Sequence, residues 1–147
     1  MTNLPSPSPG LVIRYSYLWR REHLKGHEEG TKDRPCAIIA ALRDEADGGT
    51  RVLVIPVTHS PPAAEDEAVE LPQHVKSALG LDSERSWIVL SEWNDFIWPG
   101  PDVRRLPGGS DASIAYGSLP APFFRRVHAR FLKIAKEGRA RRVVRTT

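Results

Sequence analysis

Two short polar segments contain the side chains best suited to bind and process a phosphate ester. Asp33-Arg34-Pro35 precedes an apolar run, and Thr58-His59-Ser60 follows another. An arginine guanidinium forks onto two phosphate oxygens, and neighbouring hydroxyl groups add hydrogen bonds. Such groups also stabilise the extra negative charge of a phosphoryl-transfer transition state. The residue types are therefore compatible with a phosphate site, provided that folding brings the two segments together.

The same residues also have a purely structural interpretation. Arg34 would then be a solvated charge at a turn, while Thr58 and Ser60 would cap the end of a strand. Taken alone, the residue types favour this structural interpretation.

The elements around the two segments predict that they meet. Residues 36–42 form a continuous apolar run, residues 52–57 form a second within an expected strand at 51–57, and Asp47-Gly48-Gly49 between them is a hairpin signal. In a hairpin, the start of the first strand lies beside the end of the second. We therefore expect Arg34 and Thr58 to be neighbours. Pro56 predicts an edge position or a bulge, because proline cannot donate to the ladder.

The remaining pattern predicts an α+β protein that is mainly β, with a small curled sheet or barrel. Strands are expected at 11–18, 69–71 and 86–96, a short helix at 72–79, and connections at 19–32 and 99–118. Apolar residues recur at helical spacing over 120–137, so one long amphipathic helix is expected there. We divide the chain into a disordered Ser/Pro leader (1–9), a single domain (10–137) and a basic tail (138–147).

Composition places the chain among ordinary globular proteins. It has 147 residues, of which 40% are hydrophobic and 27% charged, proportions that exclude a disordered chain. A single cysteine, Cys36, excludes a disulfide framework. The apolar runs are too short to span a bilayer and no secretory signal is visible, so we expect a cytoplasmic protein without a membrane partner.

Charge is distributed unevenly along the chain. From Phe123 onward there are nine arginines and lysines and one acid, which is +8 and leaves −5 for residues 1–122. This asymmetry fits an anionic partner such as nucleic acid or an acidic protein. It fits equally a solvated helix face followed by a frayed tail.

Several motifs, in order, resemble the MazF/PemK family of toxin–antitoxin endoribonucleases. Residues 26–39 (GHEEGTKDRPCAII) are similar to the family's Gly-x-Glu-Gln-Gly-x-x-Arg-Pro loop and following strand, with about one extra residue. Residues 55–60 (IPVTHS) resemble its Pro-Ile-Thr-Ser segment, with His59 inserted. Residues 86–93 resemble its Ser-x-Val-Leu-x-Glu strand, and 116–119 its Gly-x-Leu before the last helix.

The resemblance implies a fold and an activity. The fold would be a small SH3-like barrel of the CcdB/MazF type with a C-terminal amphipathic helix. The activity would be metal-independent cleavage of single-stranded RNA, in which a 2′-hydroxyl attacks the adjacent phosphate and no cofactor takes part. Arg34 and Thr58 match the family's catalytic residues. The resemblance also implies a homodimer and a peptide antitoxin that blocks the RNA groove.

Other residues are candidates for supporting roles. His59 has no standard counterpart in the family, and we include it as a catalytic candidate because arginine transfers protons poorly. Trp19 and Trp98 lie in expected loops, where exposed aromatic rings can stack on bases. The expected substrate-binding residues are Glu28, Lys32, Ser60, Glu92, Asn94 and Trp19.

Three alternatives compete with this interpretation. His23 and His27, four residues apart beside glutamates, have the spacing of metal ligands, but Gly26 and the loop composition argue against a stable helix there, so no metal site is predicted. A protein of the same fold could instead be a non-catalytic toxin that inhibits DNA gyrase, as CcdB-like toxins do. The third alternative is a barrel that binds nucleic acid or peptide without cutting it.

Overall fold

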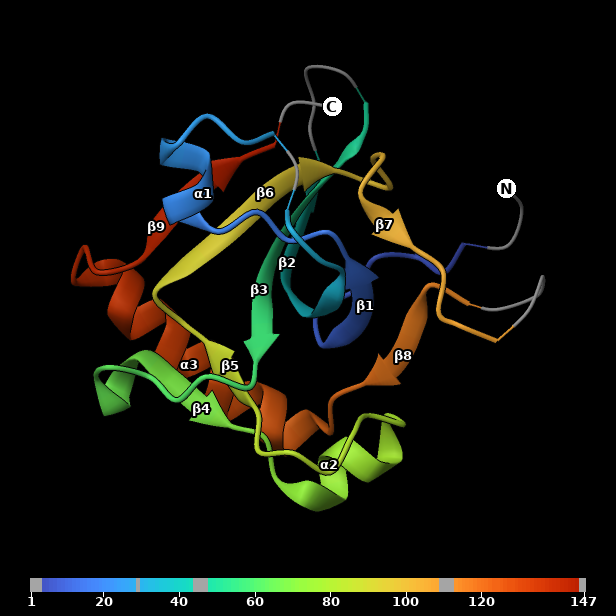
Figure 1. Ribbon diagram of the computed structural model, residues 1–147, viewed down its shortest axis with the longest axis vertical. Coiled ribbons are helices and arrows are strands. Elements are labelled where there is room, and N and C mark those ends of the chain that lie inside the picture. The colour runs from blue at the N-terminus through green and yellow to red at the C-terminus, as the bar shows by residue number, and fades with distance from the viewer. Residues whose placement is uncertain (1–3, 29, 44–47, 109–112, 146–147) are drawn as a thin grey trace.

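The chain folds mainly into β-structure, as predicted, with one long helix packed against the sheet and two short helices at its periphery (Figure 1). The computed structural model describes residues 4–28, 30–43, 48–108 and 113–145. Its strands are β1 Leu11–Tyr15, β2 Arg34–Arg43, β3 Thr50–Thr58, β4 Ala68–Glu70, β5 Trp87–Val89, β6 Glu92–Ile97, β7 Val103–Arg104, β8 Ala115–Ser118 and β9 Arg141–Val144. The α-helices are α1 Arg20–Leu24, α2 Gln73–Ala78 and α3 Ala121–Lys136, and Glu65–Glu67 form a single 3₁₀ turn.

The sheet is curled, with the β2–β3 hairpin at its centre. The strand order is β4-β5-β3-β2-β1-β7, and β8 also pairs with β1. Strand β6 pairs with β3, and β9 runs parallel to β6 along its other edge. Among the described strands no ladder joins β4 to β7, so the sheet remains open.

The predicted hairpin is confirmed, and its register explains the position of Pro56. Cys36 lies opposite Pro56, with Arg43 opposite Thr50. On its other edge, β3 pairs with β6 through Val54 and with β5 from Val57 onward. Pro56 lies between these two ladders, so neither of them needs an N–H from it. Of the predicted turn, residues 44–47 lie outside the described part of the chain.

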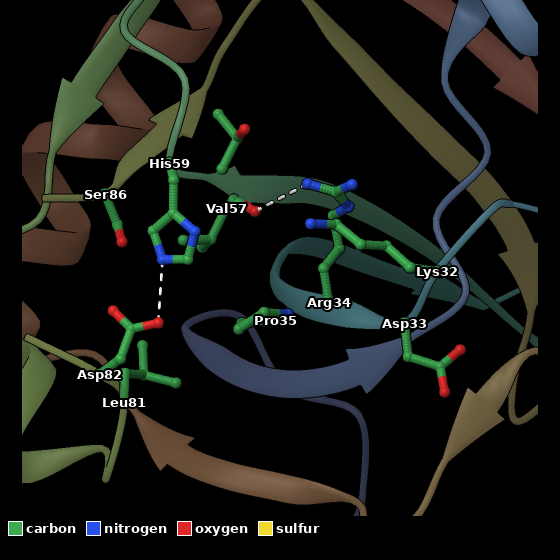
Figure 2. A pocket seen from close by; sticks show the side chains of 10 residues that line it. Lys32, Asp33, Arg34, Pro35, Val57, His59, Leu81, Asp82 and Ser86 are labelled. Carbon is green, nitrogen blue, oxygen red and sulfur yellow. Dashed lines mark hydrogen bonds and ion pairs between the residues drawn. The ribbon is translucent and has the colours of Figure 1, made fainter. Parts of the chain in front are cut away.

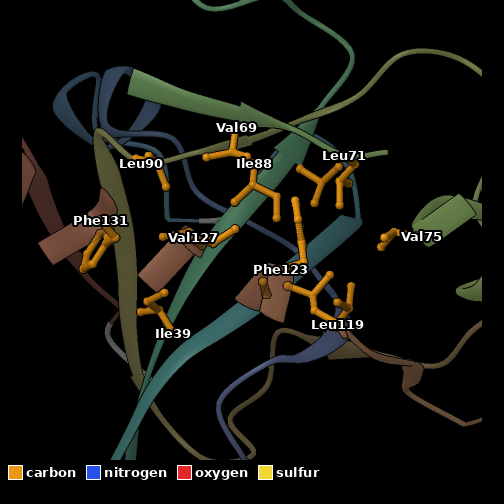
Figure 3. Close-up of a cluster of buried hydrophobic side chains, with 14 of the residues drawn as sticks. Ile39, Val69, Leu71, Val75, Ile88, Leu90, Leu119, Phe123, Val127 and Phe131 are labelled. Atoms are coloured by element: carbon orange, nitrogen blue, oxygen red, sulfur yellow. The ribbon is translucent and has the colours of Figure 1, made fainter. Parts of the chain in front are cut away.

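Both faces of the central hairpin are buried, which is why its strands are continuously apolar. Ala37, Ile39 and Ile55 face a cluster covered by α3, whereas Cys36 and Val54 face a second cluster inside the curl. Phe123, Val127, Phe131 and Ile134 all come from one side of α3 and pack onto the first cluster, as Figure 3 shows for the three residues labelled there.

The two longer helices lie where the sequence predicts them. Proline occupies the N-cap of both, at Pro72 and Pro120, and α3 ends just before Gly138. Gly138 has a φ of +73°, a left-handed conformation that glycine adopts without steric cost and that commonly ends helices. No helix within the described residues is long and apolar enough to cross a membrane.

Three expectations about the elements are wrong. The expected connection at 19–32 contains helix α1. The expected continuous strand at 86–96 is interrupted at Leu90 and Ser91, because β5 pairs with β4 whereas β6 pairs with β9. The connection at 99–118, expected to hold at most one short strand, contains β7 and β8.

The expected basic tail at 138–147 is also wrong for residues 141–145. Strand β9 pairs with β6, and Val143 is buried. Arg145 is buried as well, where its guanidinium forms an ion pair with Asp102 at 3.0 Å and donates to the Ser16 carbonyl at 2.8 Å. The end of the described chain is therefore part of the packed structure. Residues 4–9 of the expected leader have no regular secondary structure.

Candidate phosphate-binding site

Arg34 and Thr58 line the same pocket, as the hairpin predicts. The pocket has a volume of about 120 Å³ and lies where β2 begins and β3 ends. Lys32 and His59 also line it, together with Asp82 from the loop after α2. Figure 2 shows Lys32 and Arg34 on one side of the pocket and His59 and Asp82 on the other. The site therefore combines cations, a hydroxyl group and an imidazole.

The Arg34 guanidinium has unused hydrogen-bond donors. Its Nη1 makes one long bond of 3.5 Å to the Val57 carbonyl, and its buried Nε has no acceptor among the described residues. No described carboxylate forms an ion pair with it, whereas Arg145 and Arg139 each pair with a carboxylate. Partial burial lowers the pKa of Arg34, but arginine starts so high that it stays charged. A half-buried guanidinium that pairs with no carboxylate among the described residues is suited to bind an anion.

Thr58 is the last residue of β3, and its side chain is partly exposed. Its Oγ1 accepts a hydrogen bond from the Ser60 backbone N–H at 3.2 Å, which leaves the hydroxyl proton free to be donated. Thr58 also lines a second, larger pocket, together with Ser60. Thr58 therefore contributes to the walls of both pockets.

The imidazole of His59 lies between two carboxylates. Nε2 is 2.9 Å from Oδ2 of Asp82, the contact marked in Figure 2, and Nδ1 is 3.3 Å from Oε2 of Glu84. Asp82 is itself held at 2.8 Å by the ammonium of Lys76. This Lys76 contact holds the pKa of Asp82 below its usual range, and His59 contributes in the same direction.

Lys76 is the buried residue that anchors this network, and nothing in the sequence indicates it. Only 1% of the residue is exposed, and its ammonium also contacts Oγ of Ser86 at 2.7 Å and the carbonyl of Glu84. A lysine in a short helix is normally a surface residue, so no sequence signal marks this one. Its role is to fix the loop that presents Asp82 to His59.

The second pocket has a volume of about 280 Å³ and contains several of the predicted binding residues. Trp19, Arg21, Ser60 and Glu92 line it together with Thr58. Oε1 of Glu92 accepts from the Tyr17 hydroxyl at 3.0 Å and from the Arg20 backbone N–H at 2.9 Å. Burial raises the pKa of the Glu92 carboxyl, although these hydrogen bonds oppose the shift.

Two expectations about exposure are wrong. Trp19 was expected in an exposed loop but is only 7% exposed, because it begins α1 and packs into the inner cluster. Asn94 was expected to face a nucleotide but is completely buried. Its amide instead bonds the Leu18 N–H and carbonyl, and its Oδ1 accepts from Arg145 at 3.0 Å.

Glu28 lies away from the candidate site. It lines a different pocket beside His23, His27 and the end of β9, and its carbonyl accepts from Arg145. Of the predicted residues, the structure therefore brings Arg34, Thr58, His59 and Lys32 together, with Ser60, Glu92 and Trp19 in the adjoining pocket.

The site has one cluster of residue types that ligate metals, formed by His59, Asp82 and Glu84. The two carboxylates approach opposite nitrogens of the imidazole ring, so they do not converge on one ring nitrogen. Lys76 also occupies one oxygen of Asp82. This geometry describes a histidine held by hydrogen bonds better than a metal centre.

Internal ion pairs account for part of the uneven charge. Arg139 binds Asp66 at 2.8 Å and Glu67 at 3.2 Å, and Arg142 binds Asp95 at 2.9 Å. The basic C-terminal segment is thus partly neutralised by acids of the preceding chain. Because these basic side chains are paired within the protein, the uneven charge supports an anionic partner less strongly than the sequence alone indicates.

No family model, no curated protein sequence and no solved structure matches this chain. What the site can do chemically therefore follows from its own residues. It offers Arg34 and Thr58 as hydrogen-bond donors to a phosphate and His59, held by Asp82, as a proton-transfer group. These are the components of metal-free phosphoryl transfer.

Proposed function

We propose that this protein is a MazF/PemK-like endoribonuclease that cleaves single-stranded RNA without a metal ion. The observation that carries the proposal is the position of Arg34, whose guanidinium has no described carboxylate partner and shares a pocket with Thr58. These are the two residues that the sequence motifs match to the family's catalytic pair. A binding barrel has no need for this combination.

The proposed reaction is attack of a ribose 2′-oxygen on the adjacent phosphorus. The 2′-oxygen–phosphorus bond forms while the bond from phosphorus to the 5′-oxygen breaks, leaving a 2′,3′-cyclic phosphate and a 5′-hydroxyl. The 2′-hydroxyl loses a proton and the leaving 5′-oxygen gains one. Arg34 stabilises the additional negative charge on the phosphoryl oxygens, and the Thr58 hydroxyl donates a hydrogen bond to one of them.

His59 is the proposed proton-transfer residue, and Asp82 is its positioning residue. Asp82 holds Nε2, whereas the Glu84 side chain that faces Nδ1 is 70% exposed. Nδ1 can exchange this exposed contact for the substrate. A carboxylate that holds one ring nitrogen also fixes the tautomer and orientation of the ring.

The resemblance contributes the remaining parts of the proposal. The open, curled sheet would be a variant of the SH3-like barrel, the protein would form a homodimer, and a peptide antitoxin would cover the RNA groove. Lys32 would add electrostatic affinity for the RNA backbone at the edge of the pocket.

The test is incubation of the purified protein with a long single-stranded RNA in EDTA. Wild type is compared with Arg34→Ala, Thr58→Ala and the control Arg43→Ala, which changes an exposed arginine at the opposite end of β2. We expect wild type and the control to cleave and leave 5′-hydroxyl ends, whereas the two site variants are inactive. Circular dichroism and thermal unfolding check that all four proteins fold.

Two results would overturn the proposal. Cleavage that persists in Arg34→Ala would remove the arginine from the mechanism. Intact RNA with folded wild-type protein would favour a non-catalytic alternative, a gyrase inhibitor or a binding barrel. Inhibition of DNA supercoiling by purified gyrase would then distinguish these two.

A further inference from the structure

The larger pocket is placed to receive the group next to a phosphate bound at Arg34. Thr58 lines both cavities, and the Arg34 guanidinium lies over the ring of Trp19, which lines the larger one. A phosphate bound by Arg34 and Thr58 would therefore have this cavity immediately beside it. In RNA, the group attached beside the phosphate is a nucleoside.

Glu92 presents a fixed carboxylate to this pocket. Two donors, the Tyr17 hydroxyl and the Arg20 backbone N–H, hold Oε1, whereas Oε2 has no donor among the described residues. Because Oε1 is held in place, the free Oε2 is a hydrogen-bond acceptor with a fixed orientation. Oε2 has two lone-pair sites, so it can accept from two N–H groups that lie side by side on one edge of a ligand.

Two further side chains at the pocket favour a planar ligand. The ring of Trp19 lines the wall, while its indole N–H is buried and is not a donor to the pocket. The guanidinium of Arg21 lies 4.9 Å from the centre of the same ring. Pro61 and Pro62 add apolar surface to the wall.

We propose that this pocket binds a guanine base and that Glu92 is its specificity-determining residue. Guanine is the one common RNA base with two adjacent donors on its pairing edge, N1–H and the N2 amino group, and its O6 acceptor lies next to them. Adenine and cytosine place an acceptor where guanine has N1–H, and uracil has a single donor between two acceptors. The inference rests on the proposed function, since it names the base beside the cleaved phosphate.

A peptide arginine also carries paired N–H donors, but the charges around the pocket disfavour it. Arg21 and Arg34 both lie beside Trp19 and would repel a second guanidinium. Glu67, the other acid at the pocket, is already paired with Arg139 at 3.2 Å. A neutral base followed by a phosphate fits this charge pattern better than a cationic side chain does.

The experiment measures binding without cleavage. The probes are fluorescein-labelled hexanucleotides of thymidine that carry one central deoxyguanosine, deoxyinosine, deoxyadenosine or deoxycytidine. They lack the 2′-hydroxyl that the proposed reaction requires, so they stay intact. Inosine keeps N1–H and O6 but lacks the N2 amino group, which isolates one hydrogen bond without changing the protein.

We expect wild type to bind the guanine probe roughly ten- to a hundredfold more tightly than the other three, inosine included. Glu92→Gln should lose the difference between guanine and inosine, while Glu65→Gln, an exposed glutamate outside this pocket, should keep it. An N-acetyl-arginine-amide competitor that displaces the probe better than guanosine monophosphate would assign the pocket to a peptide and overturn the inference.

The outcome is independent of cleavage. Equal binding of the four probes by wild type overturns the guanine assignment even when RNA is cut. A clear guanine preference supports the assignment even when RNA stays intact, in which case the endoribonuclease proposal alone fails. Because the inosine comparison uses wild-type protein, misfolding of Glu92→Gln would not remove the test.

Discussion

Arg34 and Trp19 are stacked, with 4.9 Å between the guanidinium carbon and the centre of the indole ring. Arg34 lines the smaller pocket and Trp19 the larger one, so this contact couples the two halves of the candidate site. A guanidinium over an aromatic face is held by electrostatic attraction to the ring. The stack therefore fixes the orientation of the Arg34 guanidinium and of its remaining N–H donors.

Arg34→Lys tests whether the site needs the shape of the guanidinium or only its charge. Lysine keeps the charge but loses both the planar fork and the stacking on Trp19. We expect the RNA cleavage rate to fall by about a hundredfold or more, the usual effect of losing one donor to a transition-state oxyanion. Wild-type rates in Arg34→Lys would contradict this, and Arg43→Lys is the control on the same strand.

Gly30→Ala tests why a glycine precedes Arg34 in the motif. A Cβ at this position would lie 2.0 Å from the backbone oxygen of Tyr17, far inside contact distance. The loop must shift, and we expect the free energy of unfolding to fall by about 1–3 kcal/mol. Urea unfolding measures the change, with Thr31→Ala at the exposed neighbouring position as the control. Unchanged stability would show that the loop accommodates a side chain.

Arg145→Met tests whether the end of the chain is structural. The side chain is 2% exposed, and its loss leaves the buried Asp102 carboxylate with only a distant contact to Arg104 at 4.0 Å. We expect a loss of about 3–5 kcal/mol in the free energy of unfolding. Arg141→Met, at an exposed position of β9, should change stability by about 0.5 kcal/mol or less. Equal effects of the two substitutions would contradict the buried role.

Because Glu92 is titratable, we expect the preference for guanine over inosine to depend on pH. Burial raises its pKa above the ordinary glutamate value of about 4.3. As the pH falls through this raised pKa, protonation turns an acceptor into a donor, and the preference for guanine over inosine is lost. The ratio of the two dissociation constants, measured from neutral to acidic pH, checks this. A ratio constant down to the ordinary pKa would contradict the prediction.

The same shift has a consequence for stability. A raised pKa means that the folded state binds the Glu92 proton more tightly than the unfolded chain does. This contribution to the free energy of unfolding is present below the unfolded pKa and is lost as the pH rises through the folded one. Glu92→Gln should remove that part of the pH dependence, which thermal unfolding at several pH values measures.

Local patterns in the sequence were sufficient to predict the strands that carry the catalytic candidates, and the long helix as well. Two apolar runs around a turn signal predict a hairpin, and a hairpin necessarily brings Arg34 near Thr58. The amphipathic spacing before Gly138 likewise predicts α3, because a helix exposes every third or fourth residue to one side. These predictions need only the geometry of one element or one pair.

Only the tertiary structure shows which side chains around those candidates are buried and which groups they contact. Asn94 is buried because it bonds Leu18 and Arg145, and Trp19 is buried because it packs into the inner cluster, whose members come from distant parts of the chain. The burial of Lys76 and the placement of Asp82 against His59 likewise depend on how the loop after α2 packs beside the hairpin. The sequence by itself determined which residues meet across one turn. Long-range packing determined which of them are buried or paired, because burial and pairing depend on contacts that no local pattern encodes.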